Sequence, residues 1–324
     1  MKNTQLRCTR FIKLKYLQLF ILLFVIVFIY NTYHRTNKVD LSNIAFEDVN
    51  IEQLVLRLGQ FSEMTLIEKR FLYGLVQYFK PKKLVEIGVS KGGSAAIMLS
   101  AISGNRNAHL YSIDKSTHVY SKQDKPVGFL VNETFPELTN QWSLFTGVIT
   151  AEVIERIGSN IDFVLIDTVH VTPGELLNIL EVLPFLSPGA VVVFHDISLQ
   201  LSTWGGTNNT RAKLVFSNNL LYYYLRGKKI LPKPTSKRFF WNIGAIKLDR
   251  DQKQYYFDYF FPLAVHWEYM PSAQDLSILR TFFMKYYGSL MVRMFDDAIA
   301  ENSIFLSHTK QNSQVERLNK KYEQ

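Results

Sequence analysis

Short apolar runs alternate with helix-like patterns through the middle of the chain. The runs are Leu84–Gly88, Leu110–Asp114, Leu144–Val148, Phe163–Asp167 and Val191–His195, and several are rich in valine and isoleucine. Continuous apolar runs of this length are typical of strands that are covered on both faces. Their alternation with helical patterns predicts right-handed crossovers and a parallel sheet.

Start signals predict two helices outside these runs. Residues 65–79 have apolar positions at helical spacing, with Thr65 as N-cap and Glu68 three residues later. Ser272 marks the start of a second, amphipathic helix, whose aromatic residues suit core or dimer packing. Residues 238–248 predict one more strand, or two with a bend between them.

Residues 16–33 form an apolar segment without a charged residue. Its length is close to the roughly 20 residues that cross a bilayer, and five basic residues precede it. A cleaved signal peptide is the alternative, but the apolar core ends in Phe28, Ile29, Tyr30 and Asn31 rather than in small residues. We therefore expect a transmembrane signal anchor, with the N-terminus in the cytosol.

The positive charge is concentrated in the same N-terminal region. The formal net charge is +9, but seven basic residues precede the first acid, Asp40, and without them 30 basic face 28 acidic residues. The body of the chain is thus nearly neutral and gives no indication of nucleic-acid binding. The single cysteine, Cys8, excludes an intramolecular disulfide and a cysteine zinc site.

The glycine-rich turn after the first run predicts a ligand site. A P-loop needs a lysine and a hydroxyl directly after its last glycine, but Ser94 and Ala95 follow Gly93. A dinucleotide fingerprint needs glycine at the position of Ser90. Glu86 before the turn and Asp114 at the end of the second run suit S-adenosylmethionine, which carries cationic groups and a ribose diol but no phosphate. A tight turn with two solvated acids is the alternative.

Four segments in order resemble class I S-adenosylmethionine-dependent methyltransferases: VEIGVSKGGSA, LYSID, IDFVLIDTVH and LPFLSPGAVVVFHD. They look most like the branch of macrocin-type sugar O-methyltransferases and cephalosporin-hydroxylase-like proteins. The resemblance implies a Rossmann-like α/β fold, with a mostly parallel sheet and helices on both faces. It also implies an S-adenosylmethionine site lined by Glu86, Gly88, Ser90, Gly92, Gly93 and Asp114. Thr168 stands where the family often has glycine.

The ends of the fourth and fifth runs carry the candidate catalytic groups. An alcohol needs either a general base or a divalent metal to lose its proton at neutral pH. Asp167, His170 and His195 are candidate catalytic residues, and Asp167, His195 and Asp196 form a candidate site for Mg²⁺ or Mn²⁺. Both solutions stay open, as does a purely structural role for His170, in which its side chain holds a backbone carbonyl.

The sequence divides into six predicted parts. They are a cytosolic tail (1–15), a transmembrane anchor (16–33), a stem (34–64), a methyltransferase domain (65–250), a helical extension (251–308) and a polar tail (309–324). Residues 198–213, with Trp204, predict a lid or acceptor-binding loop. Asn132 and Asn208 match the glycosylation pattern.

We expect a single-pass type II membrane protein that faces the Golgi lumen and methylates a sugar hydroxyl of a glycan. A lipid-like or phenolic acceptor is the alternative among enzymes, and a catalytically inactive Rossmann-like binding protein is the alternative from another class. A homodimer is a further expectation.

Overall fold

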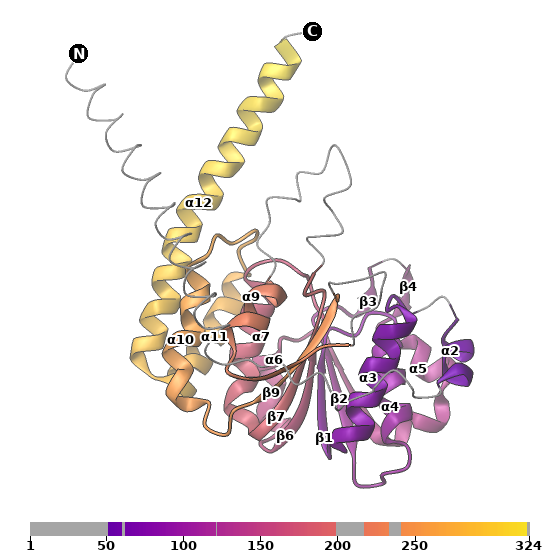
Figure 1. The fold of residues 1–324 in the computed structure, drawn as a ribbon. Helices are drawn as coiled ribbons and strands as arrows, with labels where there is room; N and C mark the ends of the chain where they lie inside the picture. Colours follow the sequence, from indigo (N-terminus) through magenta and orange to yellow (C-terminus); the bar gives the residue numbers. More distant parts are fainter. Residues whose placement is uncertain (1–50, 60–61, 121, 199–216, 233–240, 323–324) are drawn as a thin grey trace, which may run out of the picture. The chain divides into compact units, whose positions relative to one another are not determined.

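A seven-stranded sheet organises the part of the chain that the computed structural model describes, residues 51–59, 62–120, 122–198, 217–232 and 241–322 (Figure 1). Its strand order is β5-β2-β1-β6-β7-β9-β8. The first five are parallel, and β9 is antiparallel to both β7 and β8. The strands are β1 (Lys83–Ile87), β2 (His109–Asp114), β5 (Trp142–Thr146), β6 (Ile161–Ile166), β7 (Leu186–His195), β8 (Gly227–Ile230) and β9 (Ile243–Leu248), with a separate hairpin of β3 (His118–Val119) and β4 (Lys122–Pro126).

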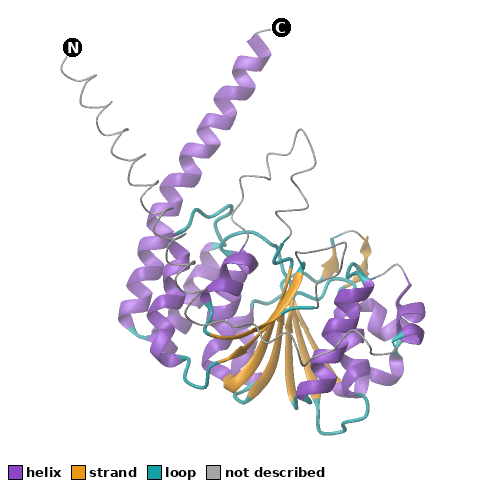
Figure 2. Ribbon diagram, viewed as in Figure 1, coloured by secondary structure: helices purple, strands orange, loops and turns teal. Residues whose placement is uncertain are grey.

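Helices cover both faces of this sheet (Figure 2). One face packs against α2 (Glu52–Leu58), α3 (Leu66–Phe79), α4 (Gly93–Ile102) and α5 (Phe129–Thr134). The other packs against α6 (Thr150–Ile157), α7 (Gly174–Val182), α9 (Ser217–Tyr224), α10 (Tyr256–Phe260), α11 (Ala273–Tyr287) and α12 (Ser289–Tyr322). Short 3-10 turns lie at Pro136–Gln141, Leu183–Phe185, Lys253–Tyr255 and Phe261–Ala264. The two apolar cores confirm the predicted Rossmann-like α/β fold with a mostly parallel sheet.

Each predicted apolar run overlaps a strand, and the predicted helix starts are also confirmed. Thr65 and Glu68 form a capping box at the start of α3, and Ser272 and Asp275 form one at the start of α11. The pattern did not predict β8, because its sequence GKKI lacks an apolar run. Lys229 in this strand is nevertheless buried, and its ammonium donates to the Leu225 carbonyl.

The transmembrane part of the predicted fold class is wrong. Within the described ranges, no helix combines the length and the apolar character needed to span a bilayer. The longest described helix, α12, carries Arg293, Asp296 and Glu301, among other polar residues. The predicted placement as a Golgi-facing membrane protein is corrected with it. The segment 16–33 lies outside the described residues, as do residues 199–213 of the predicted lid and Asn208.

Candidate active site

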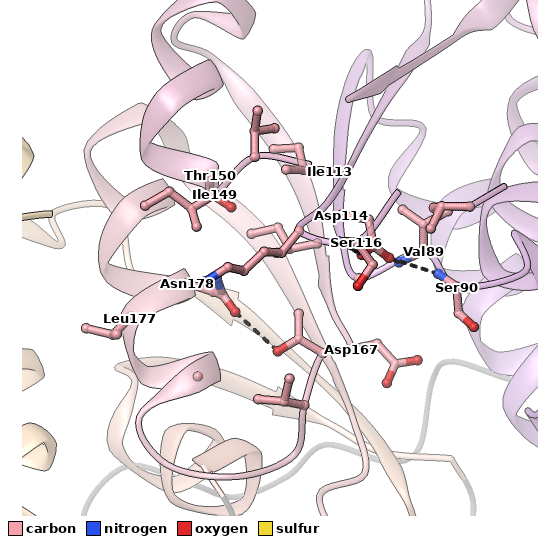
Figure 3. Close-up of a pocket in the computed structure, with 18 of the residues that line it drawn as sticks. Val89, Ser90, Ile113, Asp114, Ser116, Ile149, Thr150, Asp167, Leu177 and Asn178 are labelled. Carbon is pink, nitrogen blue, oxygen red and sulfur yellow. Dashed lines mark hydrogen bonds between the residues drawn. The ribbon is translucent and has the colours of Figure 1, made fainter. Parts of the chain in front are cut away.

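A cavity of about 790 Å³ opens at the carboxyl ends of β1, β2, β5 and β6 (Figure 3). This is the edge at which open α/β sheets bind ligands. Of the residues predicted from the sequence, five line the cavity: Gly88, Ser90, Asp114, Asp167 and His170. The other predicted residues do not line the cavity. They are Glu86, Gly92, Gly93, His195 and Asp196.

Gly88 allows the ends of β1 and β6 to come together. Its backbone has a φ of +89°, and an added Cβ would overlap the carbonyl oxygen of Asp167. Two backbone hydrogen bonds fix this arrangement: Gly88 N donates to Ile113 O at 2.9 Å, and Asp167 N donates to Ile87 O at 3.0 Å. A side chain at position 88 would therefore separate the glycine turn from the loop that carries Asp167.

Asp114 joins the end of β2 to the glycine turn. Its Oδ2 accepts from Val89 N at 2.9 Å and from Ser90 N at 3.0 Å, as the dashed lines in Figure 3 show. Its Oδ1 accepts from Ser116 N at 2.8 Å. A carboxylate offers about four acceptor positions, so about one remains for a ligand.

Glu86 lies behind the cavity rather than in it. It is fully buried, and it accepts hydrogen bonds from Ser94 Oγ at 2.5 Å and Ser112 Oγ at 2.6 Å. Burial raises the pKa of Glu86 to about 7, against the opposing effect of the two hydroxyls. Glu86 therefore links β1 and β2 to the first turn of α4, and any effect on a ligand is indirect.

Gly92 and Gly93 also serve packing. A Cβ on Gly92 would lie 3.1 Å from the Cα of Gly128, and one on Gly93 would lie 3.1 Å from the Cα of Ser62. Gly92 additionally has a φ of +96° as the N-cap of α4. These glycines let the start of α4 pack against neighbouring backbone.

Asp167, His170 and Asp196 form a compact cluster beside the glycine turn. One potential ligand atom from each lies within 4.8 Å of the other two. His170 Nε2 is 3.1 Å from Asp196 Oδ2 and 4.0 Å from Asp167 Oδ1. Asn242 donates to Asp196, and buried Glu175 accepts from His170 N at 2.6 Å. The cluster combines two carboxylates and one imidazole, a set that suits a divalent cation.

His195 lies under this cluster, among three carboxylates. Its Nδ1 is 3.4 Å from Asp167 Oδ1 and 3.3 Å from Asp196 Oδ2, and its Nε2 is 3.8 Å from Glu68 Oε2. Its side chain is 8% exposed, and neither ring nitrogen has a hydrogen-bond partner. Burial alone lowers the pKa of His195, but the carboxylates raise it well above the ordinary value. The geometry therefore makes His170, not His195, the histidine that a substrate can reach.

Several residues of the site were not predicted from the sequence, among them three acids and one tyrosine. Glu68 appeared only as a helix-capping residue, yet it also faces His195. Glu175 supports His170 from the first turn of α7. At the rim, Glu63 accepts from Tyr120 Oη at 3.1 Å and from Lys91 Nζ at 2.8 Å. The capping pattern was the only sequence signal for any of them.

Comparison with known proteins identifies the domain. The family model described as "Methyltransferase domain" matches residues 85–197. The solved O-methyltransferase TomG from Streptomyces achromogenes, in complex with SAM, is 14% identical over 68% of this chain and 94% of its own, with a TM-score of 0.41. The O-methyltransferase from Bacillus cereus, in complex with SAH, is 17% identical over 65% of this chain and 93% of its own, with a TM-score of 0.42. No curated protein matches the chain.

The family match runs from Val85 in β1 to Ile197 after β7, and so includes the strand ends that form the cavity. The matched segment contains residues of five parallel strands of the sheet, and the cavity lies at their carboxyl ends. Residues 85–197 thus match a methyltransferase domain, the class of domain that the sequence motifs predicted.

Proposed function

We propose that this protein transfers a methyl group from S-adenosylmethionine to a hydroxyl oxygen. The observation that carries the proposal is that the Gly88 turn, Asp114, Asp167 and His170 line one cavity, with Asp196 in contact with His170 behind the wall. The first two features suit the cofactor. The cluster of Asp167, His170 and Asp196 suits the removal of a proton from an alcohol. Nitrogen and sulfur acceptors need such help less than an alcohol does.

The cofactor end fits S-adenosylmethionine without phosphate-binding groups. Gly88 exposes backbone against which the methionine part can lie, and Asp114 keeps about one acceptor position for a ribose hydroxyl. Bound S-adenosylmethionine supplies an electrophilic methyl group. The remaining task of the chain is to align an acceptor oxygen and receive its proton.

The cluster beside the cofactor end of the cavity fits a divalent cation. We propose Asp167, His170 and Asp196 as the ligands of this cation. Four carboxylates and two histidines gather here, and His195 and His170 have buried ring nitrogens without a hydrogen-bond partner. A bound Mn²⁺ or Mg²⁺ would offset this negative charge and lower the pKa of a nearby hydroxyl. His195 contacts both aspartates and so holds their carboxylates in place.

We propose a sugar hydroxyl as the acceptor. Tyr120 is 72% exposed and lines the cavity, so its ring can face the apolar side of a sugar. Glu63 and His170, in the same cavity, can accept or donate hydrogen bonds to further hydroxyls. A phenolic acceptor is the alternative that the same aromatic wall accommodates.

A methyl-transfer assay tests the proposed reaction. The full chain is incubated with isotopically labelled S-adenosylmethionine and separate panels of sugars, phenols, amines and thiols, with Mn²⁺ present. We expect labelled methyl ether from at least one hydroxyl acceptor, and none from amines or thiols of similar shape. Transfer to amines or thiols alone would contradict the assignment of oxygen as the acceptor atom.

Chelation tests the metal separately. Because two of the three proposed ligands are carboxylates, we expect EDTA to abolish transfer and added Mn²⁺ to restore it. Binding of the demethylated cofactor, measured without acceptor, serves as the control and should change little. Full activity in EDTA would contradict the metal site and leave His170 as a general base.

A further inference from the structure

The ring of His170 lies between two carboxylates from different parts of the chain. Its Nε2 is 3.1 Å from Oδ2 of Asp196, which follows β7, and its Nδ1 is 3.7 Å from Oε1 of Glu175, in the first turn of α7. The His170 side chain is 31% exposed, whereas that of Glu175 is completely buried. The Nε2 edge of the ring therefore belongs to the cluster with Asp167 and Asp196, and Glu175 approaches the other edge.

Glu175 also holds the main chain of His170. The backbone of His170 has a φ of +61°, in the left-handed region that residues other than glycine rarely adopt. Glu175 Oε1 accepts a hydrogen bond from His170 N at 2.6 Å, and this bond stabilises the unusual conformation. The carboxyl oxygen that fixes the backbone is thus the same one that faces the ring.

The Nδ1 atom of His170 is buried and, among the described residues, has no hydrogen-bond partner. Buried polar atoms nearly always have one. At 3.7 Å, Glu175 Oε1 is just beyond hydrogen-bond distance, so a small rotation of the ring brings the two atoms together. Glu175 is therefore placed to accept a hydrogen bond from a protonated Nδ1.

The position of the ring proton decides what His170 can do. A neutral imidazole carries its proton on one nitrogen and offers a lone pair on the other. A histidine that binds a cation or receives a proton through Nε2 must therefore carry its own proton on Nδ1, where an acceptor fixes it. Without such an acceptor, Asp196 at 3.1 Å would hold the proton on Nε2 and block the lone pair.

We propose that Glu175 is a positioning residue that keeps a proton on Nδ1 of His170, so that the Nε2 lone pair can serve the cluster. Glu175 does not line the cavity, and so it acts on the reaction only through His170. The use of this lone pair, to bind a cation or to receive the proton of the acceptor, rests on the proposed function. Both uses require the same proton on Nδ1.

Nuclear magnetic resonance of the ring nitrogens tests the proposal without any activity. Long-range ¹H–¹⁵N spectra of the full chain distinguish protonated from unprotonated ring nitrogens. The chain has seven histidines, and the His170 signals are those that His170→Gln removes. We expect a protonated Nδ1 in the unmodified protein, with and without Mg²⁺, and a proton on Nε2 alone in Glu175→Leu. An unprotonated Nδ1 in the unmodified protein would overturn the proposal.

The affinity for Mn²⁺ separates positioning from a merely structural role. Glu175→Gln keeps the size of the side chain and an acceptor for His170 N, but it removes the charge beside Nδ1. We expect this variant to bind Mn²⁺ about tenfold or more weakly, as measured by the paramagnetic resonance of free Mn²⁺. Its affinity for S-adenosylhomocysteine should stay within about twofold. Unchanged Mn²⁺ affinity in Glu175→Gln would overturn the role of Glu175.

The matched control is Glu155→Gln on the exposed side of α6, where Glu155 pairs with Lys285 and Tyr286 outside the cavity. Both its Mn²⁺ affinity and its ring-nitrogen spectrum should equal those of the unmodified protein. If the unmodified protein binds neither Mn²⁺ nor S-adenosylhomocysteine, the proposed function falls. The proton on Nδ1 then still decides the role of Glu175, so the two failures are distinguishable.

Discussion

Asp114 serves the fold and the ligand at once. Its carboxylate holds the backbone of Val89, Ser90 and Ser116 and still faces the cavity. Removing it would therefore release the glycine turn as well as a ribose contact. Of the predicted cofactor residues, some line the cavity, as Asp114 does, and others, such as Glu86, support the residues that line it.

Asp114→Ala should weaken binding of S-adenosylhomocysteine more than about tenfold, because hydrogen bonds to a charged group contribute about 1.5–3 kcal/mol. Calorimetric titration measures the loss, and Asp124→Ala, on the exposed β3–β4 hairpin, is the control. An unchanged affinity would rule out Asp114 as a ribose ligand.

The buried carboxyl of Glu86 predicts a pH dependence of stability. Its pKa is raised from 4.5 to about 7 in the folded chain, so folding favours the protonated form. Its contribution is therefore complete below the unfolded value and lost as the pH rises through about 7, to an extent of up to about 3 kcal/mol. Glu86→Gln should make the free energy of unfolding depend less on pH between 5 and 8.

Urea denaturation at several pH values measures this effect. The exposed Glu133, which pairs with Lys125, provides the control substitution Glu133→Gln. Glu181 also has a raised pKa, so part of the wild-type slope should remain in Glu86→Gln. A slope identical to that of the unmodified protein would contradict the burial argument for Glu86.

At the scale of elements, the contact between β1 and β6 positions both halves of the site. Gly88→Ala should destabilise the protein by about 3 kcal/mol or more, because the methyl group would overlap the Asp167 backbone at a positive φ. Gly104→Ala, with no atom within 4 Å of the added Cβ, should change stability by about 0.5 kcal/mol or less. Equal effects in chemical denaturation would contradict the proposed tight contact.

The sequence predicted those elements whose formation depends on local pattern. Continuous apolar strands and capped helices carry their own signals, and β1, β2, β5, β6, β7 and α3 were all predicted. The β3–β4 hairpin and β8 were not, since neither has a regular apolar pattern. Their formation depends on pairing with partners distant in the sequence, which a local pattern does not encode.

For the whole molecule, the unexpected finding is that the C-terminal extension completes the cavity. Tyr269, Asp275 and Leu279 line it, and Asp275 pairs with Lys115, the residue after Asp114. The sequence placed Asp167, His170, His195 and Asp196 at one sheet edge from strand order alone. It could not place Glu68, Glu181 or Leu279 there, because helix packing decides which of their side chains face the site.

Ligand binding should therefore stabilise the extension. With saturating S-adenosylhomocysteine, amide hydrogen exchange in α11 should slow by up to about 100-fold, as expected when ligand exceeds its dissociation constant by the same factor. Helix α2, on the opposite face of the sheet, is the internal control and should change little. Unaltered exchange in α11 despite binding would show that the extension is not part of the binding site.

We expect the cavity to bind S-adenosylmethionine. Calorimetric titration of the full chain with S-adenosylmethionine and S-adenosylhomocysteine, with and without Mn²⁺, tests it most directly. We expect one site per chain with a dissociation constant on the order of 1 μM, which corresponds to about −8 kcal/mol. The absence of binding to both compounds, with and without Mn²⁺, would contradict the account.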